Sequence, residues 1–345
     1  MRILFAGNLV SALETSWQRF DVMRRMGHTV EGVDLGPYGD LGQRRFLRRI
    51  DGRAFTETNL REANALVLKR VEIWGPDILW VDKGLLIVPN TLRKIKERWP
   101  ALQLIAYQDD NPFGSRTFER PFWRSFIEGI AEYDLHFVKR SQDVERFCRA
   151  GAKQCRLFVT GFYEPLFAAS EKAVGKYRHD VCFVGTAIDD RATVISQMML
   201  KNKVSVDVYG RRWNRFLVYY LKRKQFHDLL PAEHYADVTR ESRINLGFVS
   251  HSNCDEYNGR SFDIPASGGF FLAERTPAHQ SFYQEGVEAD FFSSTEELFD
   301  KISFYLKNED VRVNIARRGY ERCMQEDYSL SRRLRDALAV VEALK

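Results

Sequence analysis

RSFDIPASGGFFLAE, residues 260–274, is the stretch that decides the fold. Residues 260–267 can form two turns of helix, and Gly268-Gly269 can end that helix in a left-handed conformation. The short apolar run at 270–273 is typical of a strand that is buried in a parallel sheet. The stretch therefore predicts a helix, a glycine stop and a buried strand, which together form one αβ unit.

The same helix is also a candidate binding element. We expect its N-terminus, near Arg260, to offer free backbone N–H groups and a partial positive charge to a phosphate. Asp263 lies one turn further in, where a carboxylate can accept hydrogen bonds from sugar hydroxyls. The alternative is an ordinary αβ unit in which the glycines only end the helix.

The N-terminal half begins with a strand-helix-strand alternation. Residues 2–6 form an apolar strand that Gly7 ends, a helix is expected over 16–26, and a second strand over 28–35. This opening predicts a parallel, doubly wound sheet. Because Gly7 is the only glycine in the first turn, a GxGxxG dinucleotide fingerprint is absent.

The second half repeats the alternation after the connector GFYEPLF at 161–167. Its expected strands cover residues 180–184, 204–209, 244–249, 270–273 and 290–292. The sequence thus predicts an α/β protein with two Rossmann-like, doubly wound domains. We place them at 1–168 and 169–328, with a C-terminal helix at 329–345 that can cross back to the first domain.

An aspartate pair and two basic stretches are further candidates for catalysis or binding. Asp109 and Asp110 follow the strand expected at 102–107, and loops at the carboxyl ends of parallel strands bind ligands in open α/β sheets. The aspartates could equally shape a turn. The basic stretch 44–53 indicates either a solvated helix face or a binding patch. The stretch 215–226 could be an interfacial or acceptor-binding helix, or a packed helix with a basic outer face.

Composition narrows the class of protein. Lys and Arg total 52 against 47 Asp and Glu, so the net charge is +5, which suits an anionic substrate or membrane surface but is no strong nucleic-acid signal. The 5 cysteines form no CxxC pair, which favours a reducing cytoplasm. We expect no signal peptide and no membrane span, hence a cytoplasmic protein, with contact at the inner face of the membrane as a further option.

Several motifs follow one another in the second half. FVG at 183–185 ends a strand and has Arg191 downstream, and YGRRW at 209–213 has the form YGxxW. Asp255 and Asp263 have the spacing of an E-x7-E pattern, with Asp in both places. These motifs, with the stretch at 260–274, resemble those of CgeB-like spore-maturation glycosyltransferases, relatives of the group 1 class.

The resemblance covers most of the chain. It is strongest over residues 180–325, where 296–320 also looks like the C-terminal helices of the family. It is weaker before residue 170, where DDNP at 109–112 is similar to a DDP turn with one residue inserted.

The resemblance implies a GT-B fold, whose two domains face each other across a cleft, and transfer of a sugar from a nucleotide sugar. The donor-binding candidates are Asp263, Arg260, Arg191, Arg211, Gly185, Asp255, Ser261 and Gly7, and the catalytic candidates are Asp110 and Asp109. Arginines would stabilise the leaving diphosphate, Asp263 would bind the ribose, and Asp110 could act as base or only shape its loop. We expect a UDP-sugar donor, no cofactor and no metal.

Two alternatives remain open at this stage. One is a GT-B enzyme that transfers nothing, such as a sugar-nucleotide epimerase. The other is a catalytically silent module that binds a nucleotide sugar. The acceptor, which could be a glycan, protein, lipid or modified nucleic acid, is not indicated by the sequence.

Overall fold

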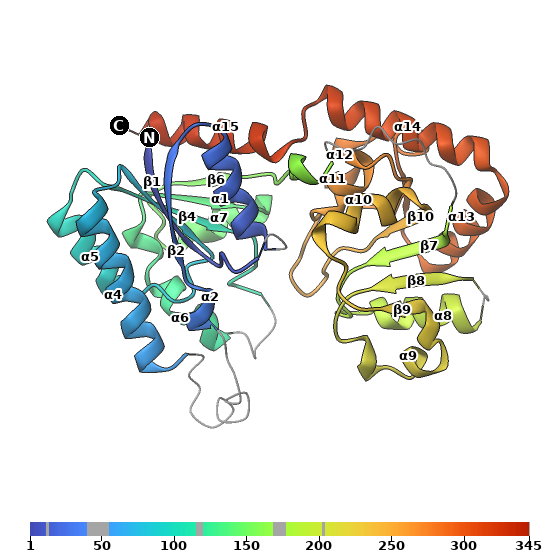
Figure 1. Cartoon of the computed structure of the whole chain (residues 1–345), viewed down its shortest axis with the longest axis horizontal. Helices are drawn as coiled ribbons and strands as arrows, with labels where there is room; N and C mark the ends of the chain where they lie inside the picture. The colour runs from blue at the N-terminus through green and yellow to red at the C-terminus, as the bar shows by residue number, and fades with distance from the viewer. Residues whose placement is uncertain (12–13, 40–54, 115–119, 168–176, 202–203, 345) are drawn as a thin grey trace. The chain divides into compact units, whose positions relative to one another are not determined.

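The computed structural model describes residues 1–11, 14–39, 55–114, 120–167, 177–201 and 204–344. They form two compact units, Met1–Val159 with Arg333–Lys345, and Thr160–Arg332 (Figure 1). The predicted boundary at residue 168 and the basic stretch 44–53 lie outside the described residues. The last helix, α15 (Leu330–Glu342), begins in the second unit and continues into the first.

The first unit is built on a parallel six-stranded sheet of order β2-β1-β3-β4-β5-β6. Its strands are β1 (Arg2–Gly7), β2 (Thr29–Asp34), β3 (Ile78–Asp82), β4 (Gln103–Gln108), β5 (Leu135–Val138) and β6 (Cys155–Leu157). The strand order reverses between β1 and β3, so the loops that leave these strands diverge.

Helices cover the faces of this sheet. They are α1 (Thr15–Arg25), α2 (Gly36–Gly39), α4 (Glu57–Trp74), α5 (Pro89–Arg98), α6 (Arg120–Glu128), the short η3 (Ile130–Glu132) and α7 (Ser141–Arg149). The bounds of α4 follow from its capping, because the Thr56 side chain accepts from the Asn59 N–H and Gly75 ends the helix at φ 58°.

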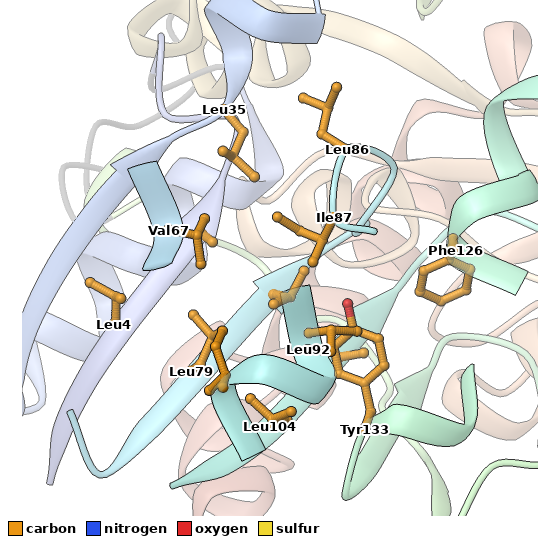
Figure 2. Close-up of a cluster of buried hydrophobic side chains, with 14 of the residues drawn as sticks. Leu4, Leu35, Val67, Leu79, Leu86, Ile87, Leu92, Leu104, Phe126 and Tyr133 are labelled. Atoms are coloured by element: carbon orange, nitrogen blue, oxygen red, sulfur yellow. The ribbon is translucent and has the colours of Figure 1, made fainter. Parts of the chain in front are cut away.

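Branched aliphatic side chains fill the space between this sheet and its helices. Leu4, Leu79 and Leu104 come from neighbouring strands and meet Val67 and Leu92 from α4 and α5 (Figure 2). All five side chains are fully buried. The apolar runs of β1, β3 and β4 are therefore buried on both sides, as a covered parallel sheet requires.

The second unit is also built on a parallel six-stranded sheet, of order β12-β11-β10-β7-β8-β9. Its strands are β7 (His179–Val184), β8 (Val206–Tyr209), β9 (Phe226–His227), β10 (Ser242–Gly247), β11 (Phe271–Glu274) and β12 (Asp290–Phe292). Here the strand order reverses between β7 and β10. The predicted α/β class with two parallel sheets is confirmed.

The second unit contains helices that the sequence predicted and others that it did not. Its helices are η4 (Glu164–Leu166), α8 (Arg191–Leu200), η5 (Trp213–Arg215), α9 (Leu217–Leu221), η6 (Arg223–Gln225), α10 (Ala232–Arg240), α11 (Arg260–Ala266), α12 (Pro277–Phe282), α13 (Thr295–Lys307) and α14 (Glu309–Gln325). The helix expected over residues 215–226 is wrong, because only the five residues of α9 are α-helical there. Among the described residues, no helix combines the length and apolar character needed to span a membrane.

Candidate functional site

The second unit carries a site where its strand order reverses. β7 and β10 lie side by side in the sheet, and their connections leave in opposite directions. Ligands of open α/β sheets bind at such points, beyond the carboxyl ends of the strands. The residues that follow β7 and β10 therefore form the candidate ligand site.

Two arginines converge on these strand ends. Arg191, the first residue of α8, donates through Nη1 to Thr186 O at 3.2 Å and through Nη2 to Val249 O at 3.0 Å. Arg260, the first residue of α11, donates through Nη1 to Val184 O at 3.1 Å and through Nη2 to Phe248 O at 2.8 Å. Both guanidinium groups also lie over the Phe183 ring, so α8 and α11 bring together residues that are 69 positions apart.

These two positive charges form no direct ion pair, although the carboxylates of Asp255 and Glu274 attract both of them over longer distances. Arg191 is only 4% exposed, and within the described part of the chain neither arginine has a carboxylate within ion-pair distance. The Nε atoms of both are buried and have no hydrogen-bond partner there. Burial, together with repulsion from Arg260, lowers the pKa of Arg191 to about 9, and burial also lowers the pKa of Arg260. A bound anion would relieve both effects.

Glycines bring the backbone of two loops close together beside the arginines. Gly185 follows β7 and Gly210 follows β8, where it has a φ of 146°. A Cβ on Gly210 would lie 2.3 Å from the Gly185 carbonyl oxygen, and one on Gly185 would lie 3.2 Å from Arg260 Nη1. The close approach therefore requires glycine at both positions.

Arg211 lies in the loop after β8 and is placed differently from Arg191 and Arg260. Its side chain is exposed, and its carbonyl accepts from the Ala187 N–H at 3.0 Å, which holds the loops after β7 and β8 together. Its guanidinium has no partner among the described residues. It is available to a ligand at the same edge of the sheet.

The N-terminus of α11 differs from the prediction. The Arg260 N–H donates to Asn258 Oδ1 at 3.1 Å, the Ser261 N–H donates to Asn258 O at 3.0 Å, and the Phe262 N–H donates to Gly259 O at 2.9 Å. The prediction of free N–H groups for a phosphate is therefore wrong, because Asn258 and Gly259 already accept from them. The positive charge at this site comes from arginine side chains instead.

Asp263 lies one turn into α11 and is half-buried. Burial raises its pKa to about 7, although the charge of Arg260 opposes this shift. Within the described residues its carboxylate makes no hydrogen bond or ion pair. The carboxylate is therefore partly desolvated and can accept from ligand hydroxyls.

Two other predicted donor residues bond to neighbouring side chains. The Ser261 hydroxyl lies 2.8 Å from His279 Nε2 and accepts from the Asn258 N–H at 3.2 Å. His279 Nδ1 lies 2.7 Å from Glu274 O, so Nδ1 carries the proton and Nε2 accepts from Ser261. Asp255 accepts from Asn253 Nδ2 at 3.1 Å in the loop between β10 and α11. Ser261 thus links α11 to α12.

The first unit carries a charged cluster where its own strand order reverses. Arg19 of α1 forms a bidentate pair with Asp82 at the end of β3, with Nε–Oδ2 at 2.7 Å and Nη2–Oδ1 at 2.9 Å. Ser16 donates to the same carboxylate at 2.7 Å. The guanidinium also lies 4.0 Å from the centroid of the Tyr107 ring. The sequence did not predict this pair, since Arg19 lies within an ordinary helix and 63 residues before Asp82.

Asp109 and Asp110 join the cluster through Lys83. The Lys83 Nζ atom lies 3.3 Å from Asp109 Oδ1 and 2.9 Å from Asp110 Oδ2. Burial alone would raise the pKa of Asp109, but the charges of Lys83 and Arg19 hold it well below its usual range. Asp109 is thus a weak base, whereas the Asp110 side chain is 42% exposed and can meet a substrate.

Lys83 adopts a conformation that is unusual for its residue type. Its φ is 65°, in the left-handed region, and Gly84 follows at φ 63°. Its N–H donates to Tyr107 O at 2.9 Å, and its carbonyl accepts from Gln108 Nε2 at 3.0 Å. These bonds to β4 hold the strained residue and direct its ammonium group at the two aspartates.

A cavity of about 400 Å³ opens beside this cluster. Gly7, Ser16, Asp82 and Lys83 line its polar side. Its apolar side is formed by Leu35, Phe55, Leu85, Leu86 and Phe122. The predicted residue Gly7 therefore lies in the first unit beside Asp82, where an added Cβ would come within 3.0 Å of the Asp82 Cβ.

No group of three or more His, Cys, Asp or Glu side chains is arranged to hold a metal ion among the residues that the structure describes.

Residues 191–339 match the sequence model of a family described as "Glycosyl transferase-like". No curated protein gives a significant match to the chain.

Solved structures resemble the chain over almost its whole length. Alr3699/HepE from Anabaena, in complex with UDP, has a TM-score of 0.64 at 13% identity, with 99% of this chain and 100% of that chain covered. Sucrose-phosphate synthase from Thermosynechococcus elongatus has a TM-score of 0.67 at 10% identity, with 100% of both chains covered. The α,α-trehalose 6-phosphate synthase from Burkholderia multivorans has a TM-score of 0.63 at 12% identity, with 99% and 96% covered. The chain therefore has the GT-B fold, and its residues 191–339 match the glycosyl transferase-like family.

Proposed function

We propose that this protein is a glycosyltransferase that moves a sugar from a nucleoside-diphosphate sugar to an acceptor. The observation that carries the proposal is the pair Arg191 and Arg260, which lie at the strand ends of the second sheet. Arg191 is buried and Arg260 half-buried, and neither forms a direct ion pair with a carboxylate of the described residues. Two adjacent cations without a direct ion-pair partner suit a diphosphate better than a single carboxylate. The match of residues 191–339 to the glycosyl transferase-like family supports the same reading.

The chemistry needs positive charge at the leaving group. The bond between the anomeric carbon and the diphosphate oxygen breaks, and its electron pair stays on that oxygen. The acceptor oxygen forms the new bond to the anomeric carbon, and the acceptor proton passes to a base. Each charge-assisted hydrogen bond from Arg191, Arg260 or the exposed Arg211 to the departing diphosphate contributes about 1.5–3 kcal/mol. The arginines can thus supply this stabilisation without a metal.

The ribose is the expected ligand of Asp263, because its half-buried carboxylate has no partner within the described residues. We propose a UDP-sugar as the donor. The Anabaena structures, which hold UDP or UDP-glucose, support this choice through the shared fold. The motifs at 183–185, 209–213 and 260–274 support the CgeB-like type within the group 1 class.

The acceptor is assigned to the first unit. The cavity beside Gly7 and Lys83 offers mixed polar and apolar walls, and Asp110 is the more accessible of the two candidate bases. Asp109 is assigned the task of holding Lys83, since a carboxylate with a depressed pKa takes up a proton poorly.

Calorimetry of UDP binding in the presence of EDTA tests the donor site. Arg260→Lys should weaken binding roughly tenfold to a hundredfold, because the single nitrogen of lysine cannot take the places of both Nη atoms, which bond Val184 O and Phe248 O, and also contact a phosphate. Arg312→Lys is the control, since Arg312 is a buried arginine of the same unit that bonds Tyr305 O instead. A requirement for Mg²⁺ or Mn²⁺, combined with equal affinities of both variants and wild type, would contradict the proposal.

Turnover separates transfer from the other chemistries of this fold. With a UDP-sugar and an acceptor extract, UDP and a glycosylated product should appear together. An isomerised UDP-sugar formed without acceptor would show an epimerase instead. Tight UDP binding without any turnover, across several sugars and acceptors, would show a binding module.

A further inference from the structure

The exposed side of α9 consists of apolar and aromatic side chains of the kind that are usually buried. Leu217, Tyr220 and Leu221 are 71%, 66% and 58% exposed, and Phe216 beside them is 36% exposed. Positions 217, 220 and 221 have the i, i+3, i+4 spacing of one helix face. We call Phe216, Leu217, Tyr220 and Leu221 the α9 patch.

The α9 patch is held outward by the opposite side of the same short helix. Val218 is only 1% exposed and belongs to the core of the second unit. The Tyr219 ring packs against Phe226 of β9 with centroids 5.4 Å apart, and the Tyr220 hydroxyl donates to Asn214 O at 3.0 Å. The helix cannot turn these apolar side chains inward without removing Val218 from the core.

Positive charge surrounds the α9 patch. Residues 208–227 contain no Asp or Glu, and their basic side chains are Arg211, Arg212, Arg215, Lys222, Arg223 and Lys224. All of them except the half-buried Lys222 are exposed. Exposed leucines and a tyrosine in a segment whose charged side chains are all basic are the composition of an interfacial membrane-binding element.

We propose that the α9 patch docks the second unit onto a membrane that contains anionic lipids. Leu217 and Leu221 enter the boundary between headgroups and acyl chains, Tyr220 stays at the headgroup level, and the bases contact lipid phosphates. Each base near an anionic surface contributes about 1 kcal/mol, so a few of them suffice for reversible binding.

A lipid surface fits this patch better than the other anionic or apolar partners. A stable protein interface buries about 800 Å² on each side, which a five-residue helix does not offer. A single-stranded nucleic acid would use aromatic rings and bases but would gain little from exposed Leu217 and Leu221. The two leucines and the bases are used together only at a membrane surface.

Vesicle flotation with the full chain tests the proposal. Wild type should float with phosphatidylcholine vesicles that contain phosphatidylglycerol, and much less with pure phosphatidylcholine. Leu217→Gln with Leu221→Gln should lower the partition coefficient about tenfold. Lys222→Gln with Lys224→Gln should lower it by a similar factor at low salt, and high salt should remove this difference from wild type. Val311→Gln with Val313→Gln, at exposed positions of α14, should bind like wild type.

The remaining outcomes overturn the proposal. Absence of flotation with both vesicle types does so directly. Loss in the lysine variant alone, with equal loss of binding to poly(U), would instead show a site for nucleic acid. The inference does not rest on the proposed function, because UDP affinity should be unchanged in all three double variants whether or not the vesicles bind.

Discussion

Asp263 is the single residue whose environment makes the clearest prediction. Its pKa of about 7 means that a proton is bound to half of the molecules at neutral pH when no ligand is present. Ribose hydroxyls that donate to the carboxylate would favour its charged form and lower this pKa. Binding should therefore release a proton, and UDP affinity should rise with pH up to about 7.

Calorimetry at pH 7 in buffers of different ionisation enthalpy measures this proton directly. We expect wild type to release about 0.5 proton more per UDP than Asp263→Asn, because only the carboxylate can lose one. Below pH 6, UDP affinity of wild type should fall up to about tenfold per pH unit relative to Asp263→Asn. Equal proton release by both proteins would remove Asp263 from the ribose site.

The Arg19–Asp82 pair makes a prediction about stability at the same scale. Both side chains are almost fully buried, so Asp82→Asn removes the bidentate partner of a buried guanidinium and leaves only the more distant carboxylate of Asp109, at 3.9 Å, beside it. We expect a loss of about 3–5 kcal/mol in the free energy of unfolding, measured by urea denaturation. Asp110→Asn, which removes a half-exposed carboxylate from the same cluster, should cost less than about 1 kcal/mol. Similar losses in the two variants would contradict this view of the cluster.

At the scale of elements, the glycines after β8 and α11 form a matched pair. Both have positive φ values, 146° at Gly210 and 79° at Gly268, but only Gly210 is crowded by another backbone atom. Gly268→Ala should cost about 1 kcal/mol for the left-handed conformation alone. Gly210→Ala should cost more and should also weaken UDP binding, since the loop after β7 must move. Calorimetry and urea denaturation of both variants measure the difference.

Local sequence patterns revealed some helices and strands and missed others. Thr56 and Gly75 set the bounds of α4 by local interactions. The strands β10 and β11 were predicted because their apolar runs are typical of a buried sheet. β9 has only two residues, and α10 and α12 lie in stretches without long apolar periodicity, so local patterns did not reveal them.

The candidate site was predictable only in part, because its contacts join residues that lie far apart in the sequence. Sequence motifs pointed to Arg191 and Arg260, but their convergence on Phe248 O depends on how β7 and β10 pair. The Arg19–Asp82 pair depends on a long-range packing of α1 against β3. The bonds that occupy the α11 N-terminus come from the side chain and carbonyl of Asn258, and helix position alone does not predict them.

At the scale of the whole molecule, α15 belongs to both units. Its first residues bond within the second unit, where the Leu330 N–H donates to Phe162 O at 2.8 Å. Leu334, Leu338 and Val341 further along are buried, and Gln103 Nε2 donates to Val341 O at 3.3 Å. The later part of α15 is thus a structural component of the first unit.

Hydrogen exchange resolves this contribution unit by unit. Leu338→Ala should destabilise the first unit by about 2–5 kcal/mol, so amides of β4 should exchange faster. Amides of β10 in the second unit should exchange as in wild type. Val313→Ala, at an exposed position of α14, is the control and should change neither set. Faster exchange of β10 alone would show that α15 stabilises the second unit, which would contradict its assignment to the first.

The divided first unit also has a consequence for the order of events during synthesis. Residues 1–159 leave the ribosome before the second unit, but residues 333–345, which complete their unit, follow only after the whole of the second unit has been made. The uninterrupted second unit can therefore fold while translation continues, whereas the earlier-made sheet must wait for its last helix. Of the two units, the one whose synthesis begins earlier is the one that is completed later.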